Sequence, residues 1–159
     1  MKVVRIFDYR NALNILKGHK PYITDEIFTI LNDPSNSLTL TIKEGSERKI
    51  SSQIQKFFED KGWLKEQATF SIPKLKYDLL KENVPIEIEI GHERLVYAVF
   101  FKFLSDYSND KIPAGVMIVV DNPLDFGHSW HNSLESTKRK IQAIEKFLLV
   151  PILVISIKP

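Results

Sequence analysis

The stretch KYDLLKENVPIEIEIG, residues Lys76–Gly91, decides the fold because it combines strand alternation with an unusual placement of acids. In its second half, Glu87 and Glu89 alternate with three isoleucines. Successive side chains of a strand point to opposite faces, so both glutamates point one way and the isoleucines point the other. The stretch therefore predicts a strand with one apolar face and one acidic face.

The first half of the stretch predicts a partner strand, joined to the second by a hairpin loop at residues 81–84. In this register Leu80 faces Pro85 and Asp78 faces Glu87. Directly opposed residues of an antiparallel pair share a face. The same register adds the apolar residues of the first strand to the isoleucine face: Leu75, Tyr77 and Leu79. One register thus predicts an apolar side and a side that gathers three acids.

The opposed acids Asp78 and Glu87 form a like-charge pair, which destabilises a strand ladder. A cation between them would reverse the sign of this interaction. Mg²⁺ accepts carboxylate oxygens and keeps several waters. A metal-bound water that loses its proton to a nearby base is a nucleophile for phosphodiester hydrolysis. The alternative is a plain solvated face of an amphipathic hairpin, because any half-exposed strand alternates.

Helices and apolar strands follow one another along the rest of the chain. The first 35 residues are predicted to be helical, including ITDEIFTILND with Thr24 as its N-cap. LTLTI, residues 38–42, is predicted as a short strand, and SERKISSQIQKFFEDKGW as an amphipathic helix that ends at Gly62. The apolar runs AGVMIVVDN and VPILVISI predict buried strands. This order indicates an α/β fold with some parallel pairing, in one domain over residues 1–159.

The composition excludes several classes of protein. The chain of 159 residues is 43% hydrophobic, but no apolar run reaches the roughly 18 residues of a membrane helix. Its first residues have no signal-peptide core, and it has no cysteine for a disulfide or a thiolate metal site. These features fit a cytoplasmic protein. The net charge of +2 permits a nucleic-acid partner without arguing for one.

The arrangement of acids resembles a known nuclease core. An acid, a step of nine residues and then Glu-x-acid on the next strand is similar to the PD-(D/E)xK motif, here Asp78, Glu87 and Glu89. The closer resemblance is to type II restriction endonucleases of the BglII and BamHI kind, which also lack the usual lysine at the last position. DKGWLKE before the hairpin, and HSWHNSLESTKRKI with VPILVISI after it, are similar to segments of the BglII type. The resemblance implies an α/β/α sandwich with a central mixed sheet.

The resemblance also implies an activity, that of a Mg²⁺-dependent DNA endonuclease, and roles for four residues. Asp78 and Glu87 would be the metal ligands, and Glu89 would orient or activate the attacking water. Glu66, three residues after Trp63, would match the extra polar residue near the metal. As an alternative, Glu66 is a surface acid in a polar loop. Two further functions stay open: a repair or junction-resolving nuclease on the same core, and a DNA-binding or assembly module without activity.

The expected partner is double-stranded DNA. His92 follows the motif where the BglII type has small polar residues that read bases. Hydroxyl, amide and imidazole groups can contact base edges or phosphates, and cations contact phosphates. The candidate DNA contacts are His92, Ser129, His131, Asn132, Lys138, Arg139 and Lys140. The alternatives are an ordinary loop or cap for the residues of HSWHN and a solvated helix face for the last three.

A homodimer is expected from the segment between about Arg94 and Tyr107, which has helical length. It carries more apolar side chains than one core-facing stripe can bury. A second subunit would cover the surplus, as in restriction endonucleases of the resembling type. Another helix of the same chain is the alternative.

Overall fold

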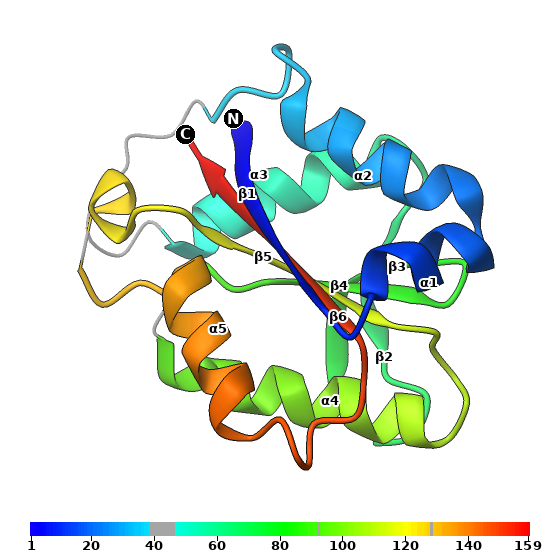
Figure 1. The fold of residues 1–159 in the computed structure, drawn as a ribbon. Helices are drawn as coiled ribbons and strands as arrows, with labels where there is room; N and C mark the ends of the chain where they lie inside the picture. Colours follow the sequence, from blue (N-terminus) through cyan, green and yellow to red (C-terminus); the bar gives the residue numbers. More distant parts are fainter. Residues whose placement is uncertain (39–46, 92, 128) are drawn as a thin grey trace.

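The computed structural model describes residues 1–38, 47–91, 93–127 and 129–159, which form a six-stranded sheet between two layers of helices (Figure 1). The strand order is β1-β6-β5-β4-β3-β2. The strands are β1 (Lys2–Tyr9), β2 (Leu64–Ala68), β3 (Lys76–Lys81), β4 (Val84–Ile88), β5 (Gly115–Val120) and β6 (Ile152–Lys158). The central strands β4, β5 and β6 are parallel to one another. At one edge β1 is antiparallel to β6, and at the other β3 is antiparallel to both β4 and β2. The sheet is therefore mixed, as the resemblance implies.

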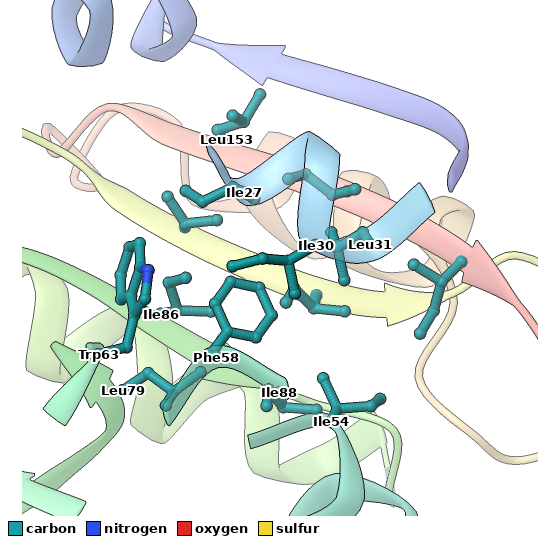
Figure 2. Packing of buried hydrophobic residues seen from close by; sticks show 14 of the residues in the cluster. Ile27, Ile30, Leu31, Ile54, Phe58, Trp63, Leu79, Ile86, Ile88 and Leu153 are labelled. Atoms are coloured by element: carbon teal, nitrogen blue, oxygen red, sulfur yellow. The ribbon is translucent and has the colours of Figure 1, made fainter. Parts of the chain in front are cut away.

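Each face of the sheet has its own apolar core. The helices are α1 (Ala12–His19), α2 (Pro21–Asn32), α3 (Glu47–Glu59), α4 (Val96–Ser108) and α5 (Leu134–Ala143), with short 3-10 helices at Glu93–Leu95 and Pro123–Phe126. Residues of α1, α2 and α3 pack in one cluster, which includes Ile27, Phe58 and Ile86 (Figure 2). Residues of α4 and α5 pack in the other, which includes Phe103 and Ile141. This arrangement confirms the α/β/α sandwich.

The hairpin that joins β3 and β4 has the predicted register beside a shorter loop, but the predicted pair of Asp78 with Glu87 is not among the pairs of the ladder. Leu80 pairs with Pro85, and Lys81 still pairs with Val84. The loop is therefore the two residues Glu82 and Asn83, both with positive φ, of 51° and 61°. Two consecutive positive φ values define the type I′ turn, whose twist matches that of a hairpin.

The predicted division of side chains between the two faces is wrong at two residues, because Leu75 is exposed before β3 begins and Tyr77 is buried on the opposite face. Leu79 lies in the cluster under α2 and α3, as predicted, but Tyr77 lies in the opposite cluster. Its ring stacks on Phe103 of α4, with ring centroids 5.9 Å apart. The pairing of β3 with β4 ends at Leu79 and Ile86. Beyond that pair β3 no longer follows the pleat of β4, so simple alternation fails.

Two predictions about the N-terminal region are also wrong. The first residues form β1, an edge strand antiparallel to β6, because pairing with a buried strand prevails over weak helical periodicity. Helix α2 begins at Pro21, so Thr24 lies inside the helix, fully buried, and is not its cap. The predicted strand at 38–42 lies outside the described residues except for Leu38.

Helix α4 sits unusually close to the sheet. A Cβ added to Gly115, the first residue of β5, would lie only 2.4 Å from the ring of Phe103. Glycine is therefore required for this approach. Among the described residues, no helix is long and apolar enough to cross a membrane.

Candidate active site

The site begins where β3 and β4 separate, at Asp78. Its Oδ2 accepts a hydrogen bond from the backbone N–H of Ile88, at 2.7 Å. Its Oδ1 accepts one from Nε2 of Gln55 on α3, at 3.2 Å. The carboxylate thus replaces a bond of the strand ladder and is held by a neighbouring strand and by a helix. Both oxygens have a fixed position before any ligand arrives.

Glu87 is buried beside Asp78, with 2% of its surface exposed. Burial raises the pKa of its carboxyl well above the usual value, and the charge of Asp78 raises it further. Lys102 of α4 forms an ion pair with Glu87 and lowers this pKa. Glu87 is therefore a buried acid that needs a nearby cation to stay ionised.

Glu89 completes the predicted group of acids. Burial, and then the charge of Asp78, raise its pKa to about 7. Burial is also the main cause that raises the pKa of Asp78, against the hydrogen bond from Ile88 and the charge of Lys102. Because Asp78 acts on both glutamates, the structure brings the three acids into one electrostatic environment, as the hairpin register predicted.

Glu66 reaches the same place from the neighbouring strand β2. It has a φ of 53°, an uncommon backbone conformation for a residue with a side chain. Its neighbours Lys65 and Gln67 both pair with β3, which places this conformation in the middle of the pairing. The charge of Glu66 raises the pKa of Asp78. Glu66 is thus exposed, as the alternative of a surface acid predicts, and also close enough to Asp78 to act on its charge.

A cleft of about 360 Å³ is lined by three of these acids, and Glu87 lies buried outside its lining. Strand residues line one side of it: Glu66, Asp78, Ile88 and Glu89. Helix α3 contributes Arg48, Ser51, Ser52 and Gln55 to the lining, which Gly91 and Leu95 complete. The cleft thus places hydroxyl groups and a guanidinium opposite carboxylates. These group types can hold a phosphate against a cation.

The reasoning from sequence missed the residues that α3 and α4 bring to the site. Arg48, Ser51, Ser52 and Gln55 belong to the polar face of an amphipathic helix, which reads as an ordinary solvated face. Lys102 has a weak signal, as a lone lysine among the phenylalanines of FFKF. A buried cation is one explanation of such a lysine, and this explanation is available without a structure.

Two of the candidate DNA contacts are buried, which argues against the predicted contact of their side chains with bases or phosphates. His131 is 2% exposed, and its Nε2 lies 2.8 Å from the carbonyl oxygen of Phe126. Asn132 is fully buried, and its Nδ2 donates to Oγ1 of Thr137. The backbone N–H of Asn132 donates to the carbonyl of Gly91, at 3.0 Å. These residues hold their loop beside the cleft, since their side chains are committed inside the protein.

The other candidate DNA contacts have different surroundings. Ser129 is exposed on that loop, and His92 lies outside the described residues. On α5, the Lys138 ammonium lies 5.6 Å from the centre of the Phe7 ring, whereas Arg139 and Lys140 line a second cleft with Tyr97 of α4. The structure therefore does not gather the three cations of α5 on one surface.

The acids fit a hard divalent ion in chemistry and in charge. Asp78 and Glu87 offer carboxylate oxygens, and a cation, the Lys102 ammonium, already lies against one of them. In the described parts of the chain, no three or more His, Cys, Asp or Glu side chains are close enough to hold one ion. Mg²⁺ needs no such cage, because it is commonly bound by one or two carboxylates with water and substrate phosphate.

Comparison with solved structures places the fold among the restriction endonucleases. The chain is similar to BglII in complex with a DNA 16-mer, with a TM-score of 0.73 and 18% identity over 98% of this chain and 76% of that one. It is also similar to free BglII, with a TM-score of 0.67 and 19% identity over 100% of this chain and 80% of that one. The class defined by these findings is that of type II site-specific endonucleases.

The family follows from the sequence. Residues 4–157 match the family model described as restriction endonuclease BglII/BglIII, and the chain belongs to this family. A search of the curated proteins finds no match.

Proposed function

We propose that this protein cleaves double-stranded DNA with Mg²⁺, and that Asp78, Glu87 and Glu89 form the catalytic centre. The observation that carries the proposal is the placement of Asp78 where β3 and β4 separate, beside two acids with raised pKa values. Such a cluster of mutually repelling carboxylates in a cleft is characteristic of a site that works with a cation.

The proposed roles follow from the surroundings of each residue. Asp78 and Glu87 would hold Mg²⁺, and Gln55 positions Asp78 through its hydrogen bond. When bound, Mg²⁺ supplies charge stabilisation for the phosphate and lowers the pKa of a water molecule. Glu89 has a pKa of about 7, so near neutral pH it can accept a proton from the attacking water.

The wall of the cleft formed by α3 supports contact with the DNA backbone. Arg48 is exposed, and it lines the cleft together with Ser51 and Ser52. Guanidinium and hydroxyl groups bind phosphate oxygens. We assign these three residues to a phosphate beside the acids, and Ser129 on the adjoining loop to a neighbouring part of the DNA.

Helix α4 supports the proposed homodimer. Phe100 and Phe103 are buried in the core, whereas Tyr97 and Phe101 are 50% and 60% exposed. A second subunit on this face would cover these side chains. A dimer also supplies two active sites, one for each strand of DNA.

Sedimentation equilibrium at micromolar concentration tests the assembly. The expected mass is twice the 18.4 kDa of one chain. Phe101→Glu should give monomers, because it places a charge in the interface, and Phe147→Glu is a matched control at an exposed phenylalanine outside α4. A wild-type protein that stays monomeric with DNA present would contradict the proposal.

Cleavage of supercoiled plasmid tests the proposed function directly. With Mg²⁺ the plasmid should become nicked and then linear, and EDTA should prevent both. A protein that binds DNA without cleaving it under either condition would instead be a DNA-binding module. Cleavage confined to branched or damaged DNA would favour a repair nuclease.

A further inference from the structure

Lys102 is a basic side chain enclosed by the helix and the sheet that carry the site. It is the single basic residue of α4, and 13% of its side chain is exposed. Its ammonium donates to the carbonyl oxygen of Lys76, at 2.9 Å, and lies 5.9 Å from the centre of the Tyr77 ring. It also pairs with Oε1 of Glu87. The ammonium is therefore held in one place by β3, β4 and its own helix.

Burying this ion pair needs a physical reason. A buried Lys–Glu pair loses the hydration of both ions, and apolar residues of similar volume often serve stability as well. The neighbouring charges supply the reason: Asp78 lies close enough to raise the pKa of Glu87, and the Lys102 charge opposes this for both acids. Without a cation here, the carboxylates would face only one another.

The motif itself lacks a cation at this place. Nucleases with the PD-(D/E)xK pattern have a lysine at the position occupied here by Glu89, and the acid adds a negative charge where that lysine would add a positive one. Lys102 brings an ammonium to the same acids from α4. The close packing of Phe103 on Gly115 fixes the helix turn that carries it.

We infer that Lys102 is the resident counterion of the carboxylate site, and that a divalent metal ion binds there in competition with it. The Glu87 carboxylate that pairs with the ammonium is one of the two proposed metal ligands. The Lys102 ammonium, in contact with a proposed metal ligand, repels an incoming divalent ion. Lys102 thus stabilises the metal-free protein and weakens metal binding. The second half of this inference rests on the proposed function, because it assumes a metal site at Glu87.

Titration with Ca²⁺ alone, without DNA, tests the competition. Binding is followed by calorimetry and by the rise in melting temperature, at about pH 8.5, so that carboxyls with raised pKa values are ionised. In Lys102→Met the apparent Kd should fall by roughly tenfold, because one repelling charge has been removed. A Kd that is unchanged or higher would overturn the competition.

A matched control is available at Lys81. This lysine pairs with Glu26, at 2.8 Å, and both side chains are about one-fifth exposed, at 21% and 23%. It does not line the cleft. Lys81→Met should therefore destabilise the protein and leave the Kd for Ca²⁺ unchanged. If both methionine variants tighten binding equally, the effect is one of overall charge and the inference fails.

The counterion role is tested separately, in the absence of metal. Lys102→Met should lower the melting temperature, because it leaves Glu87 buried without its partner. Adding Glu87→Gln should restore part of the loss, since each single change removes the same ion pair. Additive effects would mean that the two residues are not coupled. If Lys102→Met does not fold, Lys102→Gln, whose amide can still donate to the Lys76 carbonyl, replaces it in every arm.

The two experiments separate this inference from the proposed function. A wild-type protein that binds no divalent ion, with Ca²⁺ or with Mg²⁺, would count against the metal site and the competition. The coupling between Lys102 and Glu87 would still decide whether Lys102 is the counterion of the buried acid.

Discussion

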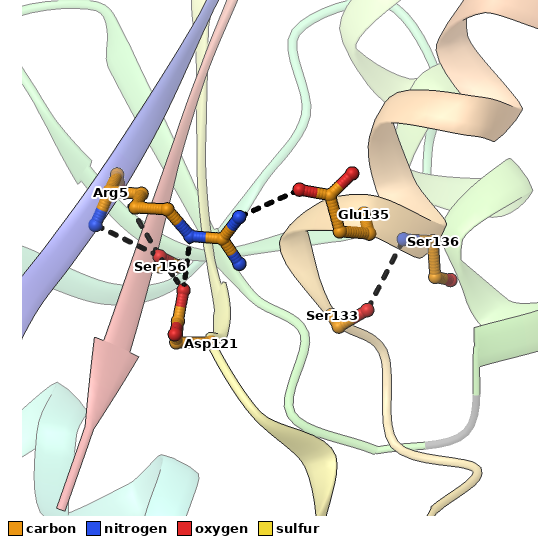
Figure 3. A network of polar contacts seen from close by, with 6 residues as sticks. All are labelled: Arg5, Asp121, Ser133, Glu135, Ser136 and Ser156. Atoms are coloured by element: carbon orange, nitrogen blue, oxygen red, sulfur yellow. Dashed lines mark hydrogen bonds and ion pairs between the residues drawn. The ribbon is translucent and has the colours of Figure 1, made fainter.

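Two polar regions lie on different parts of the same sheet, and they differ in how their charges are balanced. Around β3 and β4, three acids are close to one ammonium. Around β1, β5 and β6, the Arg5 guanidinium donates to Asp121 and to Glu135, at 2.8 and 2.7 Å (Figure 3). Ser156 adds a donor to Asp121, at 2.9 Å. Every member of this second network has a partner of the opposite kind.

The two regions differ in what their charges do to the carboxyl and guanidinium groups. The Arg5 network joins β1, β6 and the start of α5, and its hydrogen bonds with Asp121 raise the pKa of Arg5. In the acid site the pKa values of Asp78, Glu87 and Glu89 are all raised, so each carboxylate is less stable ionised than it would be in water. Carboxylates with raised pKa values do not by themselves stabilise the fold in their ionised form. The two regions therefore differ in charge balance, and the acid site is the one at which the proposed function places a cation.

The largest expected effect comes from removing acids in the two regions. Asp78→Asn or Glu87→Gln should lower Mg²⁺-dependent plasmid cleavage by about 100-fold or more, because each removes a charge that stabilises the reacting centre. Asp121→Asn changes a carboxylate of the Arg5 network and should leave cleavage near the wild-type rate. Circular dichroism checks that all three proteins fold. Equal loss in all three would erase the distinction between the regions.

The repulsion between Asp78 and the two glutamates should also be measurable in the metal-free protein, from the melting temperature of Asp78→Asn. Because this change removes a charge that raises the pKa of Glu87 and Glu89, the melting temperature should stay level or rise. A fall of several degrees would mean that the hydrogen bonds of Asp78 outweigh its repulsion.

The next effect is a dependence of stability on pH. The pKa of Glu89 is raised from 4.5 to about 7 on folding, so the folded protein binds the proton more tightly. The free energy of unfolding of the metal-free protein should therefore fall as pH rises from 4.5 to about 7, by up to roughly 3 kcal/mol. Urea unfolding at several pH values measures it. Glu89→Gln should flatten the curve in this window; an unaltered curve would assign the dependence to other groups.

A smaller effect concerns DNA binding. The logarithm of the binding constant should fall linearly with the logarithm of salt concentration, and each lost phosphate contact should reduce the slope by about 1. We expect this for Arg48→Ala, and alanine at Lys138, Arg139 and Lys140 tests whether α5, whose cations do not share one surface, also contacts phosphates. Arg5→Ala, in the balanced network, is the control and should keep the wild-type slope. Unchanged slopes for all α5 variants, with a reduced slope for Arg48→Ala, would confine the DNA to the α3 side.

The smallest effect is expected from breaking the balanced network itself. Arg5→Met should reduce the free energy of unfolding by about 1 kcal/mol or less, because the Arg5 side chain is 45% exposed and water screens its ion pairs. Urea unfolding at neutral pH measures this change, and Mg²⁺-dependent cleavage should persist. Loss of cleavage with intact folding would show that the network also supports the site.

Much of the site was predictable because its acids are close together in the chain. The register of Leu80 with Pro85 follows from alternation and a short loop, and it brings Asp78 to the two glutamates. The α/β class likewise follows from apolar runs separated by amphipathic helices. Alternation predicts the wrong face for Tyr77, because it assumes a regular ladder and the pairing of β3 with β4 ends at Leu79. The burial of His131 and Asn132 was equally invisible, since polar residues are expected at the surface.

By itself, therefore, the sequence determined the acidic hairpin, the fold class and the family. Packing between the layers brings Gln55 to Asp78 and Arg48 into the cleft from α3, brings Lys102 to Glu87 from α4, and adds Lys2–Tyr9 as an edge strand. The physical reason is the range of each signal. Periodicity reports which face of one element is buried, and it acts over a few neighbouring residues. Contacts between elements depend on how whole layers pack. The packing of Phe103 on Gly115, for example, positions α4 so that Lys102 reaches Glu87.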